Sequence, residues 1–201
     1  MHASLMPPSM SRLARMVGLP LLLLSTQSPL ARAQDAKPLR LTAFAVNMSG
    51  VGRGGAQTLQ IVIERWSTDE ERKRLIDTLV EKGSDKLLDA LDDIKPRAGY
   101  IKTTKSLGWD IQFARLHELP GGGRRIVFGT DRPIAFSEAT NNTRSSDYEY
   151  MLCEIRLDAS GKGEGKLAVA AKIAFDKAQQ KVEIENYGQQ PVRLTQVTVD
   201  K

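Results

Sequence analysis

The sequence predicts an α+β protein that is mainly antiparallel β, with one helical hairpin inserted between its strands. Apolar and polar residues alternate with a period of two over much of residues 39–199, which is typical of strands that bury one face. Between residues 67 and 96 the period lengthens to about 3.6, as in an α-helix. The links between the later strands are short and contain Gly, Pro and Asp, so they allow antiparallel neighbours but no helical crossovers.

Two strands are predicted before the helices. Residues 39–48 have a β-compatible composition, and the glycine-rich residues 49–56 turn the chain. Residues 58–66 then alternate cleanly between apolar and polar side chains, which predicts a half-buried antiparallel strand. The apolar side of this strand is formed by Leu59, Ile61 and Ile63.

The helical hairpin is predicted from its capping residues and from two apolar stripes. Ser67 or Thr68 caps the first helix, and Glu70 stands three residues after Ser67, as a capping box requires. Gly83 ends this helix in a left-handed conformation, and Ser84 caps the second helix. The stripes are Leu75, Ile76, Leu79 and Val80 in the first helix and Leu87, Leu88, Leu91 and Ile94 in the second, which Pro96 stops.

The rest of the chain is predicted to form strands. Residues 109–114 alternate, and a strand that contains Ile126 and Phe128 follows three glycines. The polar residues 138–146 form a long loop. Four strands follow in quick succession, and their short connections predict a four-stranded C-terminal meander. These four strands are residues 148–158, 166–175, 181–187 and 192–199.

About eight or nine strands leave two architectures open for the sheet, a barrel and a sandwich. Closure into a barrel removes unpaired edge strands, so we expect a strongly curved, barrel-like sheet with the helices packed over one side or end. A sandwich is the alternative. Residues 34–201 suffice for a single compact β-rich domain that buries most of its apolar surface without help from disulfides.

Residues 1–33 are predicted to be a cleavable secretory signal. Arg12 and Arg15 precede the apolar residues 16–24, and an Ala-Arg-Ala sequence then places the cleavage before Gln34. The apolar run is much shorter than the roughly 20 residues that cross a bilayer as a helix. The mature protein is therefore expected to be periplasmic or secreted, with no membrane anchor after cleavage.

Charge and cysteine usage exclude several partner classes. The full chain has 29 Lys and Arg against 24 Asp and Glu, and loss of the three arginines in the signal lowers the net charge from +5 to +2. Acids and bases are interleaved, so no nucleic-acid partner or anionic-membrane footprint is expected. Cys153 is the single cysteine, and it shares an apolar strand face with Ile155, so we expect it to be buried.

Short segments, taken in order along the chain, carry a family resemblance. They are residues 66–72 (Trp-Ser-Thr-Asp-Glu-Glu-Arg), 99–101, 106–109, 129–134, 185–187 and 191–192. In this order the segments resemble a family of uncharacterised exported bacterial proteins, found especially among acidobacteria, and the likeness spans nearly all of the mature domain. The resemblance implies a bacterial, exported setting and transfers no functional residue.

Histidine and cysteine are too scarce for several kinds of catalytic site. His117 is the one histidine that remains after signal removal, so no histidine-rich site for zinc, iron or copper can form within one chain. No Gly-x-Ser-x-Gly sequence is present to form a serine-nucleophile turn. A cysteine–histidine dyad would require Cys153 to meet His117, and the apolar strand face of Cys153 argues against this.

Other polar features have simpler structural interpretations. The glycine-rich residues 50–55 precede a strand, whereas phosphate-binding loops run into a helix, so a hairpin loop is favoured. Residues 158–164 alternate oxygen ligands as calcium loops do, but Lys162 occupies a ligand position, which favours a glycine-rich hairpin. A glycosidase carboxylate pair depends on a separation that the sequence does not contain. Trp66 and Trp109 are expected at the core or its edge.

Asp131 and Arg132 are the candidate ligand-binding residues. They belong to Gly-Thr-Asp-Arg-Pro at residues 129–133, the most concentrated polar feature in an apolar neighbourhood. An Asp-Arg pair beside a strand end is suited to an anionic ligand. The alternative is a turn fixed by Pro133 in which Asp131 hydrogen-bonds its own backbone. No catalytic residue, metal ligand or cofactor is predicted.

The sequence thus predicts an exported noncatalytic domain that binds a small molecule or a protein partner. A carboxylate-based hydrolase and an envelope-assembly component with an exposed sheet edge are the alternatives. A large apolar cavity in a closed barrel would favour a carrier, and converging acids with separated pKa values would favour an enzyme. A long unpaired edge strand would favour assembly.

Overall fold

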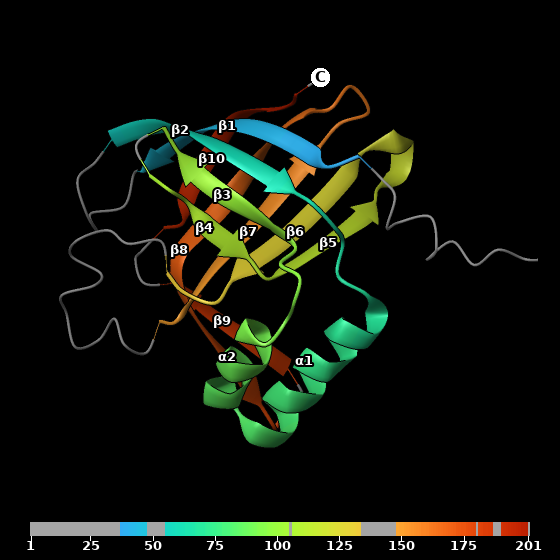
Figure 1. Cartoon of the computed structure of the whole chain (residues 1–201), viewed down its shortest axis with the longest axis vertical. Helices are drawn as coiled ribbons and strands as arrows, with labels where there is room; N and C mark the ends of the chain where they lie inside the picture. The colour runs from blue at the N-terminus through green and yellow to red at the C-terminus, as the bar shows by residue number, and fades with distance from the viewer. Residues whose placement is uncertain are drawn as a thin grey trace, which may run out of the picture.

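The protein is a curled antiparallel sheet, nearly closed into a barrel, with two helices against one end (Figure 1). The computed structural model describes residues 37–47, 55–104, 106–133, 148–179, 181–186 and 190–200. The predicted α+β class and the inserted helical hairpin are confirmed, and the sheet takes the barrel-like form. In chain order the elements are β1 (Leu39–Asn47), β2 (Gly55–Ile63), α1 (Asp69–Lys82), α2 (Ser84–Asp92), β3 (Gly99–Thr103), β4 (Trp109–Ile111), β5 (Phe113–Glu118), a 3-10 turn (Pro120–Gly122), β6 (Arg124–Thr130), β7 (Tyr150–Leu157), β8 (Lys162–Asp176), β9 (Lys181–Asn186) and β10 (Val192–Val199).

The sheet curls because one stretch of chain joins its two ends. The strand order is β4-β3-β2-β1-β10-β8-β7-β6-β5, so β4 and β5 lie at opposite ends although only Gln112 separates them in sequence. The Ala98 N–H donates to the Ile111 carbonyl at 2.7 Å, and the Gln112 N–H donates to the Gly129 carbonyl at 3.1 Å. The single strand predicted for residues 109–114 is therefore wrong, because the chain changes its pairing partner at Gln112.

Ser67 also hydrogen-bonds across this junction. Its backbone N–H donates to the Ala114 carbonyl at 2.8 Å, and its hydroxyl oxygen accepts from the Ala114 N–H at 3.0 Å. Arg115 donates from Nη1 to the Ser67 carbonyl at 2.8 Å. Ser67 is only 3% exposed, so these bonds form away from water, where an unpaired polar group is costly. The segment after β2 is thereby held on β5.

Apolar side chains from every strand in the order from β4 to β5 fill the barrel interior. Strand alternation turns every second residue inward, as predicted for residues 58–66. Cys153 is among these residues, so its predicted burial is confirmed, and burial raises the pKa of its thiol well above the ordinary value. Trp66 and Trp109 pack partly buried against this core, as expected. Its largest fully buried members include Leu41, Leu59, Ile61, Ile63, Ile101, Ile111, Ile126, Phe128, Met151 and Ile155.

The two helices pack on the outside of the barrel against β7 and β8. Their predicted stripes contribute four buried leucines to a second apolar cluster, which also contains Tyr150 and Ala171. The Tyr150 hydroxyl donates to the Ser84 carbonyl at 2.8 Å and so ties β7 to the start of α2. The leucines are Leu75 and Leu79 in α1 and Leu87 and Leu91 in α2.

Thr68, one of the two predicted N-caps, begins α1, but Glu71 and not the predicted Glu70 completes its capping box. Ser67, the other predicted cap, uses its hydroxyl on β5. Gly83 is the C-cap of α1 and also the N-cap of α2, so Ser84 is the first residue of the second helix. Its φ of +89° is favourable for glycine alone, but its ψ of −178° is not the left-handed helical value that we predicted.

A short strand, β3, is absent from the predicted elements. It has five residues, and two of them, Gly99 and Tyr100, follow Ala98 where the chain leaves the helices. A Cβ on Gly99 would lie 2.0 Å from the Val62 carbonyl oxygen, so β3 can approach β2 closely only with glycine here. Glycine lowers strand propensity, which is why the local pattern did not indicate a strand.

The C-terminal meander is only partly correct. Strand β8 pairs antiparallel with β7 on one side and with β9 on the other, as expected. Strand β10, however, pairs with the first half of β8 and with β1, and not with β9. Strand β8 has 15 residues, so its one edge accommodates β10 at the barrel and β9 beyond it.

Strand β8 is longer than predicted because it contains two of the glycines that we assigned to a turn. A Cβ on Gly163 would lie 1.8 Å from the Arg156 carbonyl oxygen, and one on Gly165 would lie 2.6 Å from the Glu154 carbonyl oxygen. These glycines let β7 and β8 approach closely inside the sheet. The turn itself is confirmed as a glycine-rich hairpin, in which Gly161 has a φ of +80°.

Some predicted features lie outside the described residues. They are the signal at residues 1–33, the glycine-rich loop at 49–54 and the polar loop at 138–146. Within the described part, no helix has the length and apolar character needed to cross a membrane.

We expect the Glu71 capping carboxylate to make stability depend on acid pH. Burial alone would raise the pKa of Glu71, but hydrogen bonds from Arg65 and from the Thr68 backbone outweigh it and lower the pKa below 4.5. The stabilisation is therefore present above the unfolded pKa and is lost as pH falls through the folded pKa. Replacing Glu71 with Gln should cost about 1 kcal/mol at pH 7 and flatten the acid limb of a urea-unfolding series.

Glu70→Gln is the matched control, because the side chain of Glu70 is exposed and lies outside the capping box. An equal loss of stability in both variants would show that the first-turn charge, and not the cap, sets the acid dependence.

Candidate functional site

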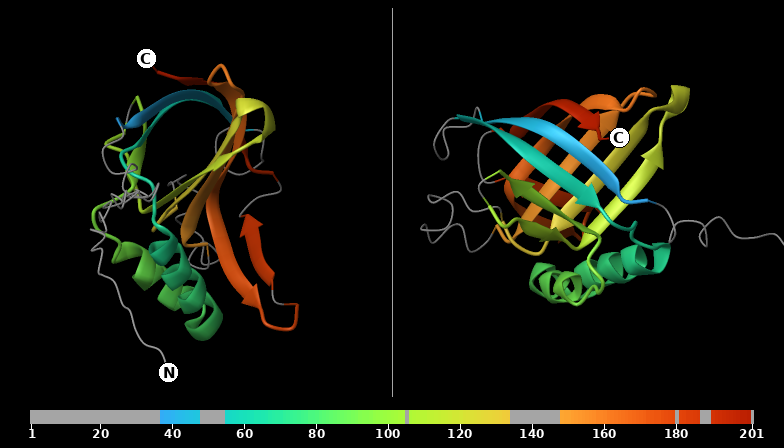
Figure 2. Two further views of the ribbon diagram at one scale, coloured as in Figure 1. Left: turned by 90° about the vertical axis from the view of Figure 1, so that its right-hand side faces the viewer. Right: turned by 45° about the horizontal axis from the view of Figure 1, so that its top comes forward.

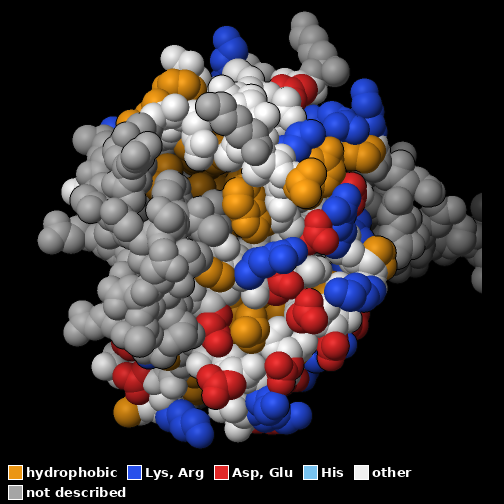
Figure 3. Space-filling model, turned by 60° about the vertical axis from the view of Figure 1, so that its left-hand side comes forward, with side chains coloured by type: hydrophobic (Ala, Val, Ile, Leu, Met, Phe, Trp, Pro, Cys, Tyr) orange, Lys and Arg blue, Asp and Glu red, His pale blue; other side chains and the backbone are white. Residues whose placement is uncertain are grey.

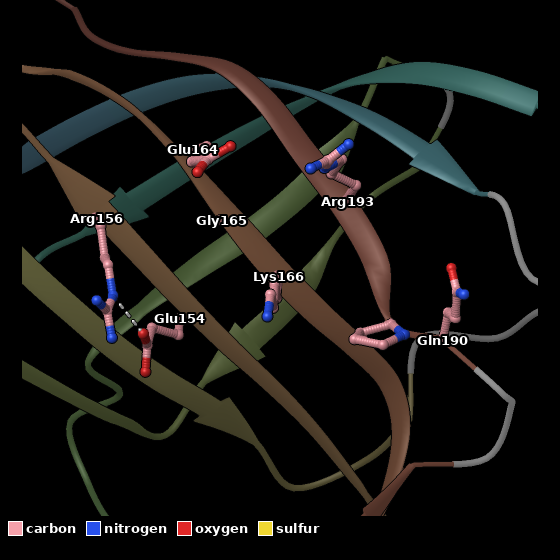
Figure 4. Close-up of a pocket in the computed structure, with 8 residues that line it drawn as sticks. Glu154, Arg156, Glu164, Gly165, Lys166, Gln190 and Arg193 are labelled. Carbon is pink, nitrogen blue, oxygen red and sulfur yellow. Dashed lines mark hydrogen bonds and ion pairs between the residues drawn. The ribbon is translucent and has the colours of Figure 1, made fainter.

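A groove lies on the outer face of β7, β8 and β10. Its volume is about 690 Å³. Figure 4 shows its side chains standing on three adjacent strands, with Lys166 between Glu154 and Arg193. We call this hollow the outer groove. It is lined by Glu154, Arg156, Glu164, Gly165, Lys166, Gln190, Pro191 and Arg193.

Strand alternation and register bring these residues together. On β7 the odd-numbered residues Met151, Cys153, Ile155 and Leu157 face the core, so the side chains of Glu154 and Arg156 point outward. Across the strands, Glu154 lies opposite Lys166, and Lys166 lies opposite Arg193. The register therefore assembles a row of charges from residues that are far apart in the sequence.

The Glu154 charge is compensated twice. Its Oε2 accepts from Arg125 Nη2 at 2.6 Å and Nε at 2.9 Å, and its Oε1 accepts from Arg156 Nε at 2.8 Å. The hydrogen bonds from Arg125 are the largest of the influences that lower the pKa of Glu154. Glu154 is therefore ionised at neutral pH, and its hydrogen bonds go to Arg125 and Arg156 and not to Lys166, its partner across β7 and β8.

Lys166 and Arg193 are two cations placed directly opposite each other on neighbouring strands. Both side chains are exposed, and within the described ranges neither forms an ion pair. Like charges directly opposite each other across a sheet are destabilising. Gly165, beside Lys166, also lines the groove.

A second, shallower hollow adjoins the outer groove and has a volume of about 450 Å³. The two share Arg156 and Glu164, so the charged surface continues toward the β7–β8 turn. In that turn Asp158 Oδ1 accepts from the backbone N–H groups of Ser160 and Lys162 at 2.8 and 3.1 Å. The Asp158 carboxylate is thus engaged in holding the hairpin.

Asp131 and Arg132, the predicted ligand residues, lie elsewhere. They follow the end of β6, and neither lines the outer groove or its neighbour. The Thr130 hydroxyl donates to the Arg132 carbonyl at 2.5 Å, which fixes the turn. Arg132 Nε lies 3.8 Å from Asp131 Oδ1, so the two side chains form an ion pair with each other.

Asp131 is in an unusual environment for a carboxylate. Its side chain is 15% exposed, and its Oδ1 lacks a hydrogen-bond partner among the described residues. Burial raises the pKa of Asp131, and a hydrogen bond with Asp92 at the end of α2 raises it further, against the charge of Arg132. The structure thus brings Asp92 to the Asp131 and Arg132 pair, a neighbour that the sequence pattern did not indicate.

The remaining candidate residues are kept apart. His117 is exposed near the end of β5, whereas Cys153 lies inside the barrel, so they do not form a dyad. Within the described ranges no three or more His, Cys, Asp and Glu side chains are arranged to hold a metal ion. On the face in Figure 3, acidic and basic side chains are interspersed over the lower half, where the helices lie.

The residues of the outer groove gave no signal in the sequence. Lys166 and Arg193 each occupy an ordinary polar position of an alternating strand. Their proximity follows from the pairing of β10 with β8, which the predicted meander did not include.

Comparisons with protein-family models, with curated proteins and with solved structures find no match for this chain. Function is therefore inferred from the residues themselves, and the resemblance to exported bacterial proteins stays a prediction.

We expect Asp131→Asn to increase stability at neutral pH. Because the folded chain binds a proton at Asp131 more tightly than the unfolded chain, ionisation costs stability above the folded pKa, and this cost disappears as pH falls through it. The advantage of the variant in urea unfolding should thus be present at pH 7 and absent at pH 3. Asp93→Asn, at an exposed neighbour of Asp92, is the control. A less stable Asp131→Asn at pH 7 would mean that the ion pair with Arg132 outweighs burial.

Proposed function

We propose that this chain is an exported, noncatalytic domain that binds a small anionic ligand in the outer groove. The observation that carries this proposal is that Lys166 and Arg193 lie opposite each other on neighbouring strands and both line the outer groove. Neither cation has an ion-pair partner among the described residues. Their mutual repulsion is a cost in the free protein, and a bound anion removes it.

The barrel core supports a site on the outer face. Its inward side chains, among them Phe128, Met151 and Ile155, are fully buried, and the two hollows described above both lie on the surface. A carrier with a ligand inside the barrel would require these side chains to be displaced from a packed core, where each one stabilises the fold.

The mixture of charges favours a compact ligand over a polyanion. The guanidinium of Arg193 is suited to a carboxylate or phosphate, and Lys166 supplies a second positive charge beside it. Glu164 stands on the same strand two residues before Lys166, and repels negative charge beyond the first anionic group. A ligand with one carboxylate or phosphate group fits this arrangement better than nucleic acid does.

The carboxylate-hydrolase alternative has less support. Asp92 and Asp131 do interact, and the pKa of Asp131 is raised, but neither acid lines either of the two hollows described. Paired acids need an adjoining space for substrate.

Binding can be tested on the processed protein, residues 34–201. We expect titration with sodium phosphate or sodium acetate at constant ionic strength to shift the backbone amide resonances of residues 164–166, 190, 192 and 193. Lys166→Gln with Arg193→Gln should weaken the affinity by about tenfold or more, because charge-assisted contacts are lost. Arg40→Gln is the matched control, since Arg40 is an exposed cation on β1. Equal weakening by Arg40→Gln, or shifts that do not saturate, would refute a defined site.

Export can be tested on the full chain in a bacterial host. The purified protein is expected to have the mass of residues 34–201 and to begin at Gln34, because small side chains at Ala31 and Ala33 fit signal peptidase. Replacing Ala33 with Arg should leave the signal uncleaved, and replacing Gln34 with Asn should not. A soluble cytoplasmic product that retains residues 1–33 would contradict export.

A further inference from the structure

Strand β9 is an open edge beyond the barrel. Among the described residues it pairs with β8 alone, and its other edge has no strand partner. Figure 2 shows the β8–β9 hairpin projecting past the barrel at the same end as the helices. Residues 181–185 are exposed throughout, so both faces and one edge of β9 are accessible. Such an edge presents unpaired backbone groups that favour addition of another strand.

One face of β9 is apolar. Val182 and Ile184 are 41% and 60% exposed, and they lie directly opposite Phe175 and Ile173 on β8. Phe175 and Ile173 pack against the helical cluster, so Val182 and Ile184 extend the same apolar face past the area that the helices cover.

The sequence of β9 is complementary to itself in one antiparallel register. With Glu183 on a two-fold axis, Lys181 lies opposite Glu185 of the second copy, and Val182 lies opposite Ile184 of the second copy. Each of these contacts occurs twice, which gives two ion pairs and two apolar pairs. Only the Glu183 pair on the axis is unfavourable.

The neighbouring registers fit less well. With Ile184 on the axis, Glu183 would lie opposite Glu185 twice. With Val182 on the axis, Lys181 would lie opposite Glu183 twice, but Ile184 would lie opposite position 180, before the strand, and would lose its apolar partner. Each of these registers shifts one strand by two positions relative to the other. A relative shift of one position would place the apolar side chains of the two copies on opposite faces of the sheet.

We propose that β9 pairs antiparallel with β9 of a second copy in this register, and so joins two barrels into a two-fold dimer. A two-fold contact uses the open edge of both copies and leaves none for further addition, so the assembly closes at two. The interface is one short strand per copy, so the dimer is reversible and concentration-dependent. This inference does not rest on the outer groove.

Sedimentation velocity of residues 34–201 over a series of concentrations tests the dimer. We expect Lys181→Glu to weaken association by about tenfold or more, since it places like charges opposite each other twice. Lys181→Glu combined with Glu185→Lys should restore it, and Glu183→Gln alone should tighten it. Lys37→Glu, which makes the same charge change before β1, should leave association unchanged. A monomer at every concentration, or equal weakening by Lys181→Glu and Lys37→Glu, would overturn the proposal.

A cross-link tests the register without relying on charge. The Tyr148 hydroxyl donates to Glu185, so Glu185→Lys also alters a contact within one copy. Glu183→Cys should instead form a disulfide-linked dimer under mild oxidation, because the two copies of residue 183 face each other on the axis. Lys181→Cys should not, and the buried Cys153 should take no part in either variant. Equal cross-linking of both variants would refute the register.

Discussion

The fold depends on the junction at which the two ends of the sheet meet. Within residues 109–118, β4 pairs with β3 and β5 pairs with β6. Ser67 hydrogen-bonds to Ala114 across the same junction. Because the polar groups there are paired, the curled sheet encloses a core of apolar side chains from nearly every strand. A packed core has no room for a ligand without loss of stability, so the binding surfaces that we propose lie on the outer face and on the strand that projects from the barrel.

On that outer face, strand pairing decides which charges meet. Glu154 forms ion pairs with Arg125 and Arg156, whereas Lys166 and Arg193 are opposed without an ion-pair partner among the described residues. The difference arises from register alone, because all five are ordinary polar residues of alternating strands. Gly163 and Gly165 let β7 and β8 approach closely where these charges lie. The outer groove is therefore a product of the sheet's tertiary pairing.

Local patterns predicted the elements well and their partners less well. The alternation of residues 58–66, the helical stripes and the burial of Cys153 are all confirmed, because each depends on which face of an element is apolar. Three features were not predicted, because they depend on contacts between distant segments. They are the change of pairing partner at Gln112, the pairing of β10 with β8 and the inclusion of Gly163 and Gly165 in a strand. The same limit applies to function: Asp131 and Arg132 stand out as a local cluster, whereas the charges of the groove become neighbours only after folding.

Strand β8 has a role that its length makes possible. Its first part carries Glu164 and Lys166 and pairs with β10, and its last part pairs with β9. Between them, near Ala168 and Ala171, its register against β7 is irregular. The groove and the projecting edge thus share one continuous backbone that bends between them. If an anion in the groove changes the free energy of pairing at β9, thermodynamic linkage requires pairing to change the affinity of the groove by the same factor. Strand β8 is the element that the two surfaces have in common.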